Sequence, residues 1–266
     1  MGDQKPVGDH LRLWRQRRRM SQLDLALEAE VSTRHLSFLE TGKAQPSRDM
    51  LLHLTETLAV PLRERNGILV AAGFAPVFGE RRLDDPALAA ARLAVETVLC
   101  GSEPSPALAV DRLWNVVSAN KAATGLLRGV HPSLMEKPNA LRLALHPQGV
   151  GPRIVNYAEW RAHILARLRH QIATSGDIEL EALMKEVAAY PEPAQAGGRT
   201  PHTLDHAPFI TPLRLRAGDA ILSFMSVMTT FGTPVDITLS ELAIETFFAA
   251  DAQTAEALRT MAADAR

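Results

Sequence analysis

The sequence has a single cysteine and no long apolar run. Cys100 cannot form a disulfide within the chain. No stretch approaches the roughly 18 consecutive apolar residues that a membrane span needs, and the chain does not open with the charged start and apolar run of a signal peptide. These absences exclude a disulfide scaffold and argue against a membrane partner, and they predict a soluble protein of a reducing cytoplasm.

An excess of either charge is also missing. The formal net charge of −1 gives no argument for or against a polyanionic partner. The charge is unevenly distributed, because residues 1–82 hold 13 basic and 10 acidic side chains, a net of +3, and residues 83–266 hold 16 and 20, a net of −4. The run RLWRQRRR at 12–19 holds five arginines and no acid. Such a run is often only a solvated helix face, so its meaning depends on its neighbours.

Familiar catalytic motifs are missing as well. The chain has no glycine-rich phosphate loop, no Gly-x-Ser-x-Gly and no His-Glu-x-x-His. Cys100 follows an apolar helical pattern, which predicts a buried, unreactive thiol. The nearest approach to a metal site is HTLDH at 202–206, with His163 and His170 on a predicted helix, and we interpret these as ordinary loop and surface histidines. We therefore expect no catalytic residue, no metal and no cofactor, and no enzyme activity.

What is present is enough apolar sequence for two domains. The chain has 266 residues, of which 46% are hydrophobic. Helical periodicity and capping residues divide the first 75 residues into five short helices without any strand. The first is expected at 8–18, the second begins at Gln22, the third begins at Thr33, the fourth is expected at 48–59, and the fifth runs from Pro61 to just before Gly73. Ser21, Ser32 and Ser47 are the expected N-caps of the second, third and fourth helices.

The second and third of these helices pack around one tight corner in SQLDLALEAEVSTRHLSFLETGK. Ala26 is small where the two helices cross, and five further positions that must face inward are apolar: Leu25, Ala29, Val31, Leu36 and Leu39. Glu30 stands at the corner, where the chain needs a left-handed backbone. Glycine adopts that conformation freely, whereas any other residue pays about 1 kcal/mol. Six requirements of a helix-turn-helix motif are met, and one is not.

This stretch resembles the Cro and phage-repressor-like helix-turn-helix family, also called the XRE family. The likeness covers residues 8–73 and includes Gln22, Leu25-Ala26, Val31-Ser32, Leu36 and the closing LETGK. It implies an all-α five-helix domain whose second motif helix enters the major groove of double-stranded DNA. The alternative is a five-helix protein-interaction module with an arginine-rich surface.

The resemblance also implies which side chains contact DNA. Gln22 and Ser32 would contact phosphates or the edge of the site, and Lys43, Arg48, Arg12 and some of residues 15–19 would contact phosphates. Four side chains would face bases: Thr33, Arg34, Ser37 and Phe38. Arg34 can take guanine O6 and N7 together, and Phe38 can meet a thymine methyl.

The remainder of the chain predicts an α+β domain. The segment 73–86 is rich in glycine, proline and charge, and we place a helix-turn-helix domain at 1–75, a linker at 76–85 and a second domain at 86–266. Helices are expected at 86–99, 120–127, 157–174, 178–189 and 254–262. Strands are expected at 107–110, 114–118, 209–216 and 220–230, forming a mainly antiparallel sheet.

The run ALAVDRLWNVVSANKAATGLL at 107–127 resembles the opening of PAS-like sensor domains. Together with HPQGVGPRIVNYAEWRAHILARLR and TTFGTPVDITLSELAIETFFAAD, it resembles the MmyB-like ligand-binding domain, over residues 85–262. That likeness implies a lipid-like or fatty-acid-like ligand.

A PAS-like sheet covered by helices can enclose an apolar pocket with a few polar groups. Candidate lining residues are Trp114, Val116, Tyr157, Trp160, Phe209, Phe224, Met225, Met228 and Phe231, and candidate polar residues at the rim are Asn120, Asn156, Arg161 and His146. Plain core packing stays the alternative for each apolar candidate.

The sequence therefore predicts a cytoplasmic bacterial transcription regulator that binds an inverted-repeat operator as a homodimer. A small apolar effector in the second domain would change the affinity for DNA. The alternative is a DNA-binding protein whose second domain, without a ligand, serves only dimerisation or docking of a partner.

Overall fold

The computed structural model describes residues 5–193, 211–232, 234 and 236–264. Its contacts form two compact units. The first contains Met1–Arg81 with Ala173–Gly176 and Thr233–Ser240, a segment that holds the short helix α12 (Ile237–Ser240); the second contains the rest. The expectation of two domains, one helical and one α+β, is confirmed.

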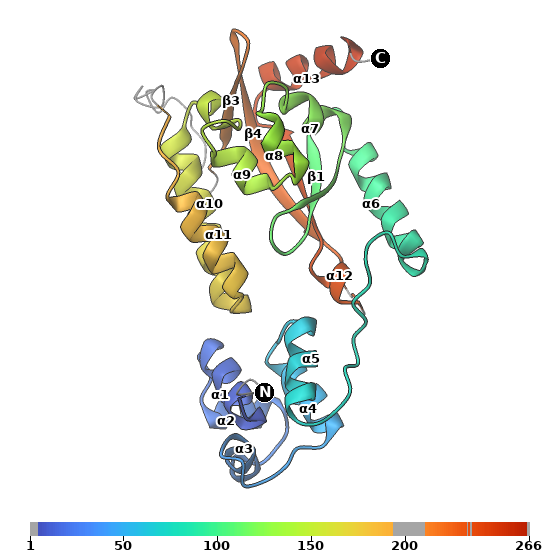
Figure 1. The fold of residues 1–266 in the computed structure, drawn as a ribbon, viewed down its shortest axis with the longest axis vertical. Coiled ribbons are helices and arrows are strands. Elements are labelled where there is room, and N and C mark those ends of the chain that lie inside the picture. Colours follow the sequence, from blue (N-terminus) through green and yellow to red (C-terminus); the bar gives the residue numbers. More distant parts are fainter. Residues whose placement is uncertain (1–4, 194–210, 233, 235, 265–266) are drawn as a thin grey trace. The chain divides into compact units, whose positions relative to one another are not determined.

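Five helices from the N-terminal part of the chain build the core of the first unit (Figure 1). They are α1 (Val7–Arg17), α2 (Gln22–Glu28), α3 (Thr33–Glu40), α4 (Arg48–Thr57) and α5 (Leu62–Ala71). Ser21, Ser32 and Ser47 each accept a backbone N–H at a helix start, as expected, and Ser21 also forms a capping box with Asp24. Short polar side chains thus set where three of the helices begin.

The core of the first unit joins all five helices. It contains the apolar positions expected at the helix-turn-helix corner together with Leu11 and Trp14 of α1, both almost fully buried. Gly8 allows α1 to approach the end of α3, since a Cβ atom there would lie 2.5 Å from the Leu39 carbonyl oxygen. The position of α3 is therefore fixed by close packing against α1.

A five-stranded antiparallel sheet forms the centre of the second unit, in the order β2-β1-β5-β4-β3. The strands are β1 (Ala107–Val110), β2 (Val116–Ala119), β3 (Leu213–Ala217), β4 (Ala220–Thr230) and β5 (Ala243–Ala249). We expected no strand at β5, which is nevertheless the middle of the sheet. This strand does not show the alternation of apolar and polar residues that predicts a half-buried strand. Three consecutive residues are buried, Ile244, Glu245 and Thr246, because this part of β5 is covered on both faces.

Helices pack against both faces of this sheet, but on the face that contacts α6 the side chains of Met225, Val227 and Phe248 remain exposed. The elements are a 3-10 turn (Pro86–Leu88) running into α6 (Ala89–Gly101), α7 (Lys121–Leu126), α8 (Pro132–Glu136), α9 (Ala140–Leu145), a second 3-10 turn (Gly151–Arg153), α10 (Tyr157–Ser175), α11 (Ile178–Ala188) and α13 (Ala252–Asp264). The pattern had not predicted α8, α9 or the second 3-10 turn, which are only three to six residues long. In Figure 1, α10 and α11 lie on one side of the sheet and α6 on the other.

The alternation of strand residues separates two apolar layers. Leu108, Phe224 and Phe247 belong to the larger core with α9, α10 and α11. Ala107, Ala109 and Ile244 belong to a smaller core with Val95 and Leu99 of α6. The register supports this separation, since Ala109 pairs with Ile244 and Leu108 pairs with Glu245.

Two local expectations need correction. The strand expected at 114–118 begins only at Val116, because Trp114 takes a left-handed backbone with φ 66° and ends the β1–β2 turn. Cys100 is exposed rather than buried. It directly follows the buried Leu99 on α6, and one residue is about 100° around a helix, so the apolar face turns inward without it. Among the described helices, none has the length and hydropathy to cross a bilayer.

Candidate functional site

The first candidate site is the solvent face of α3. Thr33 and Arg34 are exposed, and Ser37 and Phe38 are partly exposed, while Leu36 and Leu39 turn into the core. Ser32 caps the helix from an exposed position. The four side chains predicted to face bases therefore lie on one accessible face of one helix.

Two cations flank the aromatic ring on this face. The Arg34 guanidinium lies 5.4 Å from the centroid of the Phe38 ring, and the Lys43 ammonium lies 5.9 Å from it. Lys43 and Arg48 are both exposed. The Phe38 ring thus contacts the guanidinium of the exposed Arg34 side chain.

Behind this face lies a buried carboxylate, Glu40 at the end of α3, which is 2% exposed. Arg15 donates to both of its oxygens, Nε to Oε1 at 2.6 Å and Nη2 to Oε2 at 2.8 Å, and Gln22 Nε2 donates to Oε2 at 2.9 Å. Burial alone would raise the pKa of Glu40, but the hydrogen bonds from Arg15 and Gln22 and the charges of Arg15 and Arg12 outweigh it, so the pKa lies below its ordinary value.

Two side chains that were predicted to contact DNA, Arg12 and Gln22, are hydrogen-bonded to Glu40 within the protein. Arg12 Nη2 donates to the Glu40 carbonyl oxygen at 2.9 Å, and Gln22 donates to the Glu40 carboxylate. Both side chains are partly exposed and remain predicted DNA contacts. Sequence reasoning had not found the pair of Arg15 and Glu40, although an acid inside the closing LETGK beside an arginine-rich helix was an available signal.

The corner of the motif has the predicted geometry. Glu30 takes a left-handed backbone with φ 53°, and the neighbouring Val31 N–H donates to the Ala26 carbonyl at 2.9 Å. The packing of the surrounding helices therefore holds a residue that does not favour this conformation.

The second candidate site is an apolar cavity of about 100 Å³ within the second unit. It lies between the sheet and helices α7, α9 and α10. Its lining includes Leu108, Leu141, Ile164, Leu215, Phe224 and Phe247. Two charged side chains, Arg167 of α10 and Glu245 of β5, also line it.

These two charges form one ion pair inside the cavity wall. Arg167 Nη1 lies 2.7 Å from Glu245 Oε1, and Glu245 is 3% exposed. The Ser226 hydroxyl of β4 donates to the same carboxylate oxygen. The Arg167 guanidinium also stacks on the Trp114 ring, 4.2 Å from its centroid. We call Arg167 and Glu245 the charged pair of the cavity.

Two donors in this wall have no partner among the residues that the structure describes. They are Arg167 Nε and the indole Nε1 of Trp160, both inaccessible to solvent. Trp160 and Arg167 are two turns apart on the same face of α10, and both line the cavity. Buried polar groups without a hydrogen bond are rare, and each indicates a missing partner or a strained site.

A histidine borders the same wall. The His163 ring stacks on Trp160, with centroids 5.2 Å apart. Burial and the charge of Arg167 lower the pKa of His163 below its ordinary value, against a smaller opposing effect of Glu245. His163 is therefore neutral at neutral pH.

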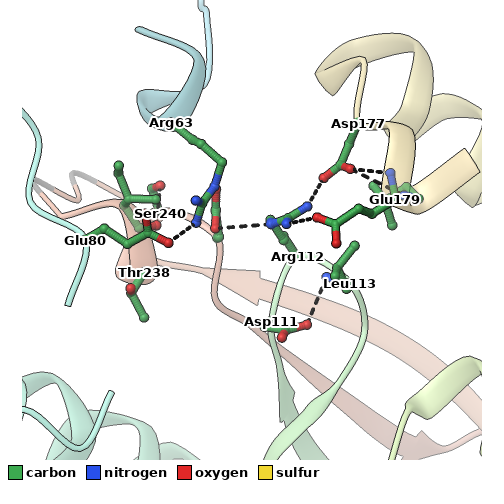
Figure 2. Close-up of polar contacts among 12 residues, drawn as sticks. Arg63, Glu80, Asp111, Arg112, Leu113, Asp177, Glu179, Thr238 and Ser240 are labelled. Atoms are coloured by element: carbon green, nitrogen blue, oxygen red, sulfur yellow. Dashed lines mark hydrogen bonds and ion pairs between the residues drawn. The ribbon is translucent and has the colours of Figure 1, made fainter. Parts of the chain in front are cut away.

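The β1–β2 turn positions the aromatic support of Arg167. Trp114 Nε1 donates to Gln171 Oε1 at 3.0 Å, and Gln171 Nε2 donates to the Arg112 carbonyl at 3.1 Å. Arg112 in turn pairs with Asp177 and Glu179 at the start of α11 (Figure 2) and lies 3.8 Å from Glu241. The turn is thus linked to α10 through Gln171 and to the start of α11 through Arg112.

The structure separates the predicted ligand residues into two groups. Val116, Trp160 and Phe224 line the cavity. Trp114 contacts Arg167 from outside the described lining, and Tyr157 is buried with its hydroxyl donating to the Leu145 carbonyl at 3.0 Å.

The polar candidates make contacts outside the lining: Asn120 caps α7, Asn156 is hydrogen-bonded to the backbone of Pro212 and Arg214, His146 packs edge-on against Tyr190, and Arg161 donates to the Ala188 carbonyl. Among the apolar candidates, Met225 and Met228 are exposed, and Phe231 packs against the smaller core beside α6. Phe209 and HTLDH lie outside the described residues.

Sequence reasoning missed both members of the charged pair. Arg167 follows Trp160 by seven residues on a predicted helix, and Glu245 interrupts the apolar run AIETFFA, so each had a usable signal. Within the described part of the chain, no three His, Cys, Asp or Glu side chains are grouped as a metal site would require.

Comparison with known families is consistent with both sites. A model of the MmyB-like transcription regulator ligand binding domain matches residues 91–261, and a helix-turn-helix domain model matches residues 6–66. No curated protein matches the chain.

Proposed function

Because the chain belongs to the MmyB-like transcription regulators, with a helix-turn-helix domain ahead of the ligand-binding domain, we propose that it binds an inverted-repeat operator as a homodimer. A small apolar effector, fatty-acid-like as the resemblance implies, shifts its affinity for that operator. Both matched families are regulator domains rather than enzymes. We place the DNA-binding domain at 1–75, the linker at 76–85 and the effector domain at 86–266, in a protein of the bacterial cytoplasm.

The observation that carries the DNA-binding half is the accessible face of α3. It presents Arg34 on the Phe38 ring, with Thr33 and Ser37 beside it, and exposed Lys43 and Arg48 near its end. Base-edge donors at the centre and cations at the margin are the arrangement that sequence readers use, because phosphate contacts orient and base contacts specify.

Support for a dimer comes from the outer face of the sheet. Met225 pairs with Phe248 across β4 and β5, and Val227 follows on the same face; each is at least about one third exposed. Apolar side chains gathered on a solvent-facing sheet indicate a surface that another molecule covers. Two copies would present their recognition helices about 34 Å apart, one turn of the duplex.

Support for the effector is the apolar cavity with its few polar groups, which is the usual composition of a small-molecule site. An effector alters DNA affinity only by its differential affinity for two arrangements of the dimer, typically about 1 to 3 kcal/mol.

Selection from a random duplex pool tests the DNA-binding half. We expect the purified full chain to enrich an inverted repeat with half-sites about one duplex turn apart. A pool without any enriched repeat contradicts the proposal. Native mass spectrometry measures the oligomeric state in the same preparation, and a monomer on its selected duplex contradicts the dimer.

The second candidate function is that of a DNA-binding protein whose second unit only dimerises or docks a partner. The exposed Met225, Val227 and Phe248 are the observation that favours it. A small molecule that co-purifies with the protein, or a lipid that raises its melting temperature, supports sensing. An empty protein that no lipid stabilises supports docking.

A further inference from the structure

The polar end of the effector cavity is already electrically neutral. Arg167 is the one cation that lines the described cavity, and its Nη1 is paired with Glu245 at 2.7 Å. The ring of His163 stacks on Trp160 of the lining, and burial and the charge of Arg167 lower the pKa of His163, which favours its neutral form. A ligand therefore meets no unbalanced positive charge there.

The cavity lining also contains two buried hydrogen-bond donors without an acceptor among the described residues. Trp160 Nε1 and Arg167 Nε are buried and unpartnered, and both belong to side chains of the cavity lining. Leaving a buried donor unpaired is unfavourable, so an acceptor atom that enters the cavity gains affinity from each donor it satisfies. Trp160 is itself 2% exposed, which leaves bulk water no access to its indole nitrogen.

From these two observations we propose that the effector is an uncharged amphipathic molecule, an apolar chain ending in a neutral acceptor such as an amide, ester or ketone oxygen. The acceptor oxygen accepts a hydrogen bond from Trp160 Nε1 or from Arg167 Nε, and the chain lies along the apolar lining. A free carboxylate is disfavoured because it would stand beside Glu245 in a poorly solvated wall, where like charges repel strongly. This inference rests on the proposed effector function, keeps the apolar chain of the fatty-acid-like class, and replaces its acid group.

The size of the cavity limits the part of the ligand that it encloses. A cavity of about 150 Å³ in a protein core holds a benzene molecule. The space here is about 100 Å³. The enclosed part is therefore a short chain or the end of a longer one, and eight-carbon probes are suitable.

Octanamide and octanoate test the charge of the head group, because the two molecules have nearly the same size and shape. Isothermal titration calorimetry on the full chain at pH 7.5 gives both affinities. We expect octanamide to bind at least tenfold more tightly than octanoate. Equal affinities, or tighter binding of octanoate, overturn the inference while leaving an apolar effector in place.

Glu245→Gln tests the cause of this preference. The variant removes the negative charge and keeps the shape of the side chain, so Arg167 becomes available to an anion. We expect the preference for octanamide to shrink or reverse. The matched control is Glu186→Gln, which removes the partner of Arg142, an ion pair at 2.7 Å outside the cavity lining; it should leave the preference unchanged. An unchanged preference in Glu245→Gln overturns the inference.

Trp160→Phe tests the donor. The change removes the indole N–H and keeps an aromatic ring, so octanamide binding should weaken several-fold. If neither probe binds the wild-type chain up to its solubility limit, both this inference and the effector half of the proposed function fail. The duplex selection, which needs no effector, then still decides the DNA-binding half.

Discussion

Arg15 and Glu40 form a bidentate ion pair that links α1 to the end of α3. Nε and Nη2 of Arg15 each donate to one oxygen of Glu40, at 2.6 and 2.8 Å. Glu40 is buried and also accepts from Gln22 at the start of α2. One carboxylate therefore connects α1, α2 and α3, so the position of the DNA-reading face depends on it.

Glu40→Ala should destabilise the helical unit by about 3 kcal/mol, because it leaves Arg15 in a largely buried position without its counter-charge. Hydrogen exchange resolved by mass spectrometry on peptides of α1 and α3 measures the loss in this unit alone. Glu28→Ala, at an exposed position of α2, is the control and should change little. Equal effects of both substitutions would contradict the role of the ion pair.

Glu30→Gly should stabilise the same unit by roughly 0.5 to 1 kcal/mol. Relief of a left-handed backbone is worth about 1 to 2 kcal/mol, and part of this is lost to the greater freedom of glycine in the unfolded chain. The matched control is Glu28→Gly at the last residue of α2, which should destabilise, by up to about 1 kcal/mol. Denaturation of both variants separates the outcomes, since the two signs are opposite. A loss of stability in Glu30→Gly would show that the corner is not strained.

Arg34→Ala should relax base preference at one position of each half-site, by about 1 to 3 kcal/mol. Arg48→Ala should weaken binding to all duplexes alike and lower the slope of log affinity against log salt by about 1. Binding to the selected operator and to a random duplex, measured over a range of salt, distinguishes the two. Equal losses on both duplexes from both variants would defeat the assignment of Arg34 as a reader.

Acidification should destabilise the sheet unit through His163. Its pKa in the folded state is lowered by burial and by Arg167, so the unfolded state binds the proton more tightly. The neutral ring therefore contributes fully to the free energy of unfolding above the ordinary histidine pKa of about 6.5. This contribution is lost as the pH falls toward and through the lower pKa of His163 in the folded state. His163→Gln should flatten the dependence of the free energy of unfolding on pH below about pH 6.5.

Local signals predicted the helical unit well. Its helices begin at serine caps, and its core repeats at helical spacing, so neighbours in sequence determine its structure. The left-handed backbone of Glu30 followed from the same reasoning, since the corner geometry is set by a few consecutive residues.

The sheet unit was less accessible because its decisive contacts join distant segments. Glu245 reads as a flaw in an apolar run until Arg167 is brought to it from 78 residues away. Trp114 was expected to line the cavity, but it lies outside the described lining, where its ring stacks on the Arg167 guanidinium. Candidates selected for size or polarity, such as Tyr157, are internally satisfied, and only the three-dimensional arrangement shows which donors are not.

The position of β5 has a consequence for the order in which the chain folds during synthesis. The helices α1 to α5 use local contacts and can form as soon as they leave the ribosome. The sheet cannot, because Ala107–Val110 must wait for its neighbour Ala243–Ala249, and β4 waits for the same strand. Until then the nascent second unit exposes two unjoined hairpins with open edges, which is the interval in which chaperones would protect it from aggregation.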